Sequence, residues 1–116
     1  MSETDELFAS VNYIKHKVDT LEKIELLSLR SNKVLLDEYV AEFQADIVLL
    51  QVYKSIDGKR AQKDIAQILS TNEVAVSRKI KKLLELGLIE IKKVVGNNKI
   101  YMHSIAEKAF KLTKVL

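Results

Sequence analysis

The chain has 116 residues, 47% of them hydrophobic and 30% charged, which fits one compact globular domain and leaves no room for a second, catalytic domain. It has no cysteine, so disulfides and thiolate metal sites are excluded, and no apolar run approaches the roughly 20 residues that span a bilayer. The net charge of +3 is unevenly divided, because residues 1–57 hold 6 Lys and Arg against 11 Asp and Glu, whereas residues 58–116 hold 13 against 5.

An apolar stripe predicts a long N-terminal helix, from about Glu3 to Leu29. Its members are spaced four, three, four and three residues apart, as in a coiled coil, and are Leu7, Val11, Ile14, Val18 and Leu21. The spacing ends after about two heptads, because Glu25 and Ser28 occupy the next apolar positions. We expect the first part of this helix to pair with a second copy of the chain and the last part to pack on its own domain. The alternative is a helix buried wholly within one monomer.

Two shorter helices are predicted next. Asn32 is placed to cap a helix whose apolar positions are Val34, Leu35, Tyr39, Val40 and Phe43. Asp46 is placed to cap a helix over residues 47–56, and Asp57-Gly58 is a turn signal. We therefore expect residues 1–45 to form a helical segment for packing and dimerisation, and residues 46–103 to form the next domain.

The apolar spacing next predicts two helices joined by a tight turn, over residues 62–69 and 73–86. Ile65, Ile68 and Leu69 share one face of the first helix, and Asn72 is placed to cap the second. The buried stripe of the second helix consists of Val76, Ile80, Leu83 and Leu84. Its opposite face carries small residues and then cations, namely Ala75, Ser77, Arg78, Lys81 and Lys82. Small side chains permit close approach to base edges and cations pair with guanine or phosphate, so this face suits a DNA major groove. A solvated basic face is the alternative.

A β-hairpin is predicted after the second helix. Gly87 is placed to end that helix, and Leu88–Ile91 and Ile100–Met102 are two short strand patterns around a loop over residues 92–99. The loop carries three lysines for phosphates and two asparagines for a minor groove: Lys92, Lys93, Lys99, Asn97 and Asn98. An ordinary solvated turn is the alternative.

A C-terminal helix over residues 104–116 is predicted last. Ser104 and Glu107 have the spacing of a capping box at its start. Its apolar stripe is a second expected dimer contact and consists of Ile105, Ala109, Leu112 and Leu116.

These elements resemble a winged helix-turn-helix domain, particularly that of the MarR-like and ArsR-like transcriptional regulators, over about residues 46–112. Asn72–Arg78 is similar to the start of the family's recognition helix, and Leu83–Ile89 to the exit of that helix into the wing. Residues 105–109 are similar to a segment after the wing, with Ala106 and Ala109 in place of the usual Thr and Gly. The implied fold is mainly α with a small β-hairpin wing (α+β), extended by N-terminal helices and a C-terminal helix.

The resemblance and the basic C-terminal half together predict a homodimeric transcriptional regulator that binds double-stranded DNA sequence-specifically. The residues expected to contact DNA are Arg60, Thr71, Asn72, Glu73, Ala75, Ser77, Arg78, Lys81, Lys82, Lys92, Lys93, Asn97, Asn98 and Lys99. One alternative is a winged helix that binds protein. Another is an architectural protein that coats DNA without reading sequence, because 16 Lys against 3 Arg offer few side chains for base-specific bonds.

Catalytic and cofactor motifs are absent from the sequence. His16 and His103 are the only histidines and lack metal-ligand spacing, and there is no Gly-rich phosphate loop or serine elbow. We therefore expect no enzyme activity, metal or cofactor. We also expect a cytoplasmic protein without membrane contact. The sequence identifies no effector ligand.

Overall fold

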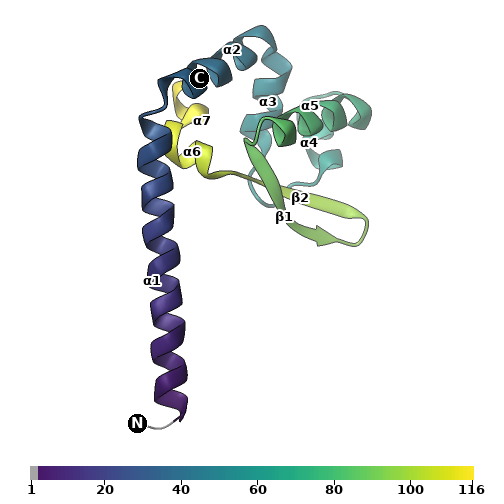
Figure 1. Cartoon of the computed structure of the whole chain (residues 1–116). Coiled ribbons are helices and arrows are strands. Elements are labelled where there is room, and N and C mark those ends of the chain that lie inside the picture. The colour runs from purple at the N-terminus through teal and green to yellow at the C-terminus, as the bar shows by residue number, and fades with distance from the viewer. Residues whose placement is uncertain (1–2) are drawn as a thin grey trace.

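The computed structural model of the protein describes residues 3–116, apart from the side chains of residues 3–8 and Tyr13. Within this range the order of elements is α1 (Glu3–Arg30), α2 (Lys33–Ala45), α3 (Ile47–Ser55), α4 (Gln62–Ile68), α5 (Glu73–Glu85), β1 (Ile89–Val95), β2 (Asn98–His103), α6 (Ile105–Phe110) and α7 (Leu112–Val115). α1 projects as a rod from a body made by the other elements (Figure 1), and the molecule measures 60 × 39 × 21 Å. Among the described helices none is both long and apolar enough to cross a membrane.

α1 joins the body through α6. Nζ of Lys108 lies 2.6 Å from Oε1 of Glu22, and Leu29 packs against the core. Four members of the predicted stripe are each more than half exposed: Val11, Ile14, Val18 and Leu21. The side chain of Leu7, the fifth member, lies outside the described residues. The interpretation of this helix as buried wholly within one monomer is therefore wrong for these four positions.

The three predicted helix caps are confirmed. The side-chain oxygens of Asn32, Asp46 and Asn72 each accept a hydrogen bond from the backbone N–H three residues later, at 3.1, 3.1 and 2.8 Å respectively. Each bond satisfies one of the backbone donors that the first turn of a helix leaves unpaired. α2, α3 and α5 therefore begin where the sequence predicts.

One hydrophobic core joins α2 and α7 to the elements of residues 46–103. Its most deeply buried side chains are Phe43, Leu49, Val52, Tyr53, Ile65, Val76, Ile80, Leu83, Leu88 and Leu112. Tyr39 of α2 adds a polar link, because its hydroxyl donates to the carbonyl of Leu86 at 3.0 Å. Burial raises the pKa of the Tyr39 hydroxyl, which keeps it protonated as this donor.

Two predicted core positions are wrong. Ile68 is 53% exposed and Leu84 is 37% exposed. Ile68 lies about 100° around the helix from Leu69, which does pack against the core, so its side chain falls outside the buried face. Leu84 lies about 100° around the helix from Leu83, which places it at the rim of the buried stripe of α5.

The wing is a longer hairpin than predicted. β1 and β2 pair antiparallel from Ile89 opposite His103 to Val95 opposite Asn98, so most of the expected loop lies in strands. The connection is only Gly96-Asn97, and Gly96 has φ +62°, which fits the first position of a type II′ turn. The register shifts between residues 91 and 93, so the residue between them forms a bulge in β1.

The predicted single C-terminal helix is broken. Lys111 adopts φ +52°, which ends α6 and begins α7. The break turns Leu112 into the core, where it is fully buried, so the prediction that Leu112 contacts a second copy is wrong in this fold. Three other residues of that predicted stripe are partly buried: Ile105, Ala109 and Leu116.

Glu107 does not complete the predicted capping box. Oγ of Ser104 does accept from the backbone two residues later, at 3.3 Å, but the Glu107 carboxylate turns elsewhere. It accepts from the backbone N–H of Thr113 at 2.8 Å and from the hydroxyl of Tyr53 at 3.2 Å. A carboxylate on α6 therefore links α3 to α7, and the backbone N–H of Ser104, which a capping box would pair with Glu107, donates to the carbonyl of Leu88 at 2.9 Å instead.

Candidate nucleic-acid interface

The outer face of α5 is polar and cationic. Val76, Ile80 and Leu83 are buried, whereas Ser77, Arg78 and Lys81 are exposed and Ala75 is half-buried. The exposed side chains follow the predicted order, with small residues in the first two turns and cations after them. In the described part of the chain, neither Arg78 nor Lys81 forms an ion pair.

Two other lysines of α5 bind the protein itself. Nζ of Lys79 lies 2.5 Å from Oδ2 of Asp46, and Nζ of Lys82 lies 3.5 Å from Oε2 of Glu42. The predicted phosphate contact of Lys82 would therefore compete with Glu42. Arg78 and Lys81 are the better placed cations of this helix.

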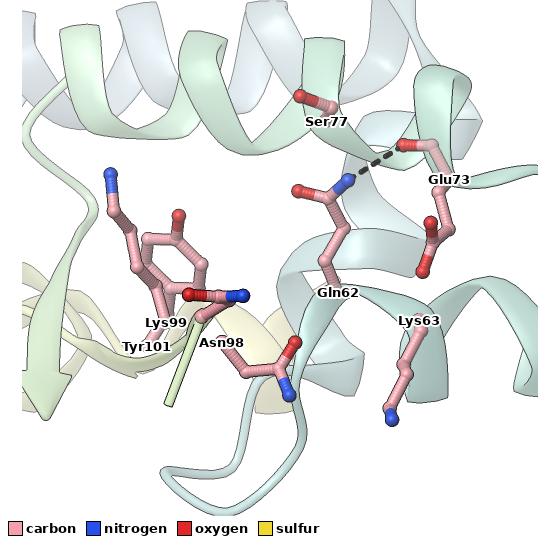
Figure 2. A pocket seen from close by; sticks show the side chains of 8 residues that line it. Gln62, Lys63, Glu73, Ser77, Asn98, Lys99 and Tyr101 are labelled. Carbon is pink, nitrogen blue, oxygen red and sulfur yellow. Dashed lines mark hydrogen bonds between the residues drawn. The ribbon is translucent and has the colours of Figure 1, made fainter. Parts of the chain in front are cut away.

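A groove of about 350 Å³ lies between the starts of α4 and α5 and the wing (Figure 2). We call it the wing groove, and it is lined by Gln62, Lys63, Glu73, Ser77, Asn97, Asn98, Lys99 and Tyr101. Nε2 of Gln62 donates to the carbonyl oxygen of Glu73 at 3.0 Å, which holds α4 against the first turn of α5 (Figure 2). The fold thus brings predicted residues of the helix and the wing together around one concave, polar surface.

Gln62, Lys63 and Tyr101 line the wing groove but were not among the predicted site residues. Gln62 and Lys63 begin α4, and Tyr101 lies on β2 with its ring largely buried. Burial raises the pKa of the Tyr101 hydroxyl, so it stays protonated. A local pattern in the sequence does not mark these residues, because only the packing of α4 against α5 and the wing brings them together.

The wing lysines differ in their surroundings. Lys93 and Lys99 are exposed, as a phosphate contact requires. Lys92 is the bulged residue of β1, and its Nζ donates to the carbonyl oxygen of Gly58 at 3.2 Å. Lys92 is exposed as well, but its predicted phosphate contact would compete with Gly58, because the bulge turns its side chain back to the α3–α4 turn.

Arg60 is also held within the protein. Its Nη1 donates to the carbonyl of Ser55 at 3.1 Å, and its Nε lies 3.7 Å from Oδ2 of Asp57. The Asp57 carboxylate accepts two backbone N–H groups of this turn, which lower its pKa. Arg60 therefore stabilises the turn before α4. Thr71, in the turn after α4, is exposed.

The histidines do not form a ligand site. His16 is exposed on α1, and Nε2 of His103 lies 2.7 Å from the carbonyl oxygen of Tyr53. Over the part of the chain that the structure describes, no three His, Asp or Glu side chains are grouped to hold a metal ion.

A helix-turn-helix whose second helix exposes small and cationic side chains beside a β-hairpin defines the winged helix class of DNA-binding domains. A family model described as winged helix DNA-binding domain matches residues 44–109, which is more than half of the chain. The chain belongs to this family. A search of curated proteins found no match.

Proposed function

We propose that this protein is a homodimeric transcriptional regulator that binds double-stranded DNA sequence-specifically. The observation that carries the proposal is the exposed face of α5 beside the wing groove, in a domain of the winged helix DNA-binding family. We further propose that the protein is a MarR-like or ArsR-like regulator, because residues 72–78 and 83–89 resemble the recognition helix of these regulators and its exit into the wing.

The proposed contacts follow from exposure. Ala75 and Ser77 approach base edges in the major groove, where small side chains leave room. The phosphate contacts come from four exposed cations that form no ion pair with the residues that the structure describes, Arg78, Lys81, Lys93 and Lys99, and the minor-groove contacts from Asn97 and Asn98. Four phosphate contacts per monomer make eight per dimer, which predicts a slope of about −7 for log affinity against log salt.

The exposed stripe of α1 supports a dimer. In two copies, eight described side chains that are more than half exposed would be buried, which contributes on the order of 10 kcal/mol. Association costs about 4–15 kcal/mol in lost freedom of motion. The free energy gained by burying the stripe is therefore close to the cost of association, so a stable dimer needs further contacts. A two-fold dimer would read two half-sites, as one recognition helix with one wing buries little surface.

The test is selection from a randomised DNA duplex pool at two salt concentrations. We expect an enriched palindrome at the higher salt. Salt-sensitive binding without enrichment would instead support an architectural protein, which the excess of lysine over arginine favours. Failure to bind at low salt would contradict both and favour a protein-binding module.

Variants test the interface itself. Arg78→Gln combined with Lys81→Gln removes two proposed contacts from each copy, so affinity at low salt should fall and the salt slope of the dimer should decrease by about 4. Lys114→Gln, an exposed charge change on α7, is the matched control and should alter neither. Unchanged affinity in the double variant would contradict the proposed orientation of α5.

A further inference from the structure

A second groove, which we call the α1 groove, lies between α1 and the body and has a volume of about 620 Å³. Its apolar lining comes from Val18 and Leu21 of α1, Met102 of β2 and Ile105 of α6. Val18 and Leu21 also belong to the apolar stripe. The stripe therefore continues from the projecting part of α1 into a concave surface of the body.

The lining of the α1 groove is acidic. Glu22, Glu25, Glu90 and Glu107 line it, against a single lysine, Lys108. Lys108 already pairs with Glu22, so it does not neutralise the other carboxylates. The groove thus fits an occupant that is apolar on one side and basic beside it.

The projecting half of α1 has this character. Residues 9–17 hold two lysines and no carboxylate, whereas residues 18–27 hold three carboxylates and one lysine. Val11 and Ile14 of this half are each more than half exposed. This half extends away from the body (Figure 1), so it can enter a groove on another molecule without displacing its own body.

We propose that two copies pair through antiparallel α1 helices, so that residues 9–17 of each copy lie in the α1 groove of the other. This orientation rests on the proposed homodimer and adds to it the contacts with Met102 and Ile105. It brings a basic segment against an acidic groove, and opposite charges across an interface favour one pairing over others.

A parallel pair is disfavoured by the same residues. It would place Glu25, which follows Leu21 in the coiled-coil spacing, opposite its own copy, and like charges there are repulsive. It would also require residues 18–27, in which Glu22 already pairs with Lys108 of the body, to enter the groove of the partner.

Engineered cysteines test the orientation, because the chain has none of its own. Val11→Cys and Met102→Cys are made as separate proteins at exposed positions, mixed, and treated with a short thiol crosslinker. We expect a crosslink between the two different proteins and little between two copies of Val11→Cys. Val95→Cys, at the exposed end of β1, replaces Met102→Cys as the matched control and should not crosslink to Val11→Cys.

The outcomes separate the two proposals. Efficient crosslinking of Val11→Cys to itself, without crosslinking to Met102→Cys, would show a parallel pair and overturn the antiparallel one. A dimer in sedimentation of the unmodified chain that gives neither crosslink would also overturn it. A monomer in sedimentation at the concentrations that bind DNA would overturn the homodimer itself.

Discussion

Replacing Asp46 separates two interactions that meet at the start of α3. Its Oδ1 accepts from the backbone N–H of Leu49 at 3.1 Å, and its Oδ2 lies 2.5 Å from Nζ of Lys79 on α5. The hydrogen bond from Lys79 is the largest influence that lowers the pKa of the Asp46 carboxyl below its usual value of 3.8. Asp46 therefore both begins α3 and fixes α5 against it.

The cap and the ion pair each contribute about 1 kcal/mol or less. Loss of a helix N-cap costs about 1 kcal/mol, within a range of about 0.5–2. The ion pair between Asp46 and Lys79 has both side chains about one-third exposed, so solvent screening limits it to about 1 kcal/mol at most. Asp46→Ala loses both and should be about 1.5–2 kcal/mol less stable at neutral pH. Asp46→Asn keeps a capping oxygen and should lose only the ion pair.

Urea unfolding at a series of pH values measures the contributions of the Asp46 cap and of its ion pair. A carboxyl whose pKa is lowered in the folded state stabilises the fold above its usual pKa, and that contribution is lost as the pH falls through the lower folded-state value. The difference between wild type and Asp46→Asn should therefore disappear when the pH falls well below 3.8. If Asp46→Ala and Asp46→Asn are equally stable at neutral pH, the cap is refuted. If the difference from wild type persists in acid, the ion pair is refuted.

Three further predictions concern the turn, the core and the wing. Gly58→Ala should lower the unfolding free energy by about 1 kcal/mol in urea titrations, because Gly58 has φ +79° and an added Cβ would lie 3.2 Å from Nζ of Lys92. An unfolding free energy equal to that of wild type would contradict this strain. Tyr53→Phe should lower the unfolding free energy by about 1–2 kcal/mol in the same assay, because Glu107 loses a hydrogen bond. Burial raises the pKa of the Tyr53 hydroxyl, so this loss of stability should be the same at neutral and mildly alkaline pH. Lys93→Gln should weaken DNA binding and reduce the salt slope of the proposed dimer by about 2 in fluorescence anisotropy, whereas Lys92→Gln should change little. Equal effects of the two wing substitutions would show that Lys92 leaves Gly58 to reach DNA.

Features that depend on one residue and its chain neighbours are predictable from the sequence. Asn32, Asp46 and Asn72 each begin a helix as predicted, because a short polar side chain can satisfy a nearby backbone donor without help from the rest of the fold. The stop at Gly87, which has φ +74°, is of the same kind. The apolar spacing of α5 similarly predicts which face is buried, with an error only at its rim.

Features that depend on distant residues are not predictable in this way. Lys92 is held by a carbonyl 34 positions earlier, and Glu107 accepts from a hydroxyl 54 positions earlier. In both cases the local pattern predicts a projecting charge or a cap, and a partner brought near by folding competes for the side chain. The wing groove has the same origin, because Gln62 and Tyr101 lie on elements that meet only after the core has formed.

The projecting half of α1 has a consequence for how this protein would diverge after gene duplication. Val11 and Ile14 belong to α1, whereas Arg78 and Lys81 belong to α5. α1 projects as a rod and α5 is part of the body (Figure 1). In the proposed dimer, substitutions on the rod would therefore change which chains pair and leave the proposed DNA contacts of α5 in place. Two daughter genes with stripes of different shape or charge would then encode proteins that form separate self-pairs, or one mixed pair, with the same proposed DNA contacts.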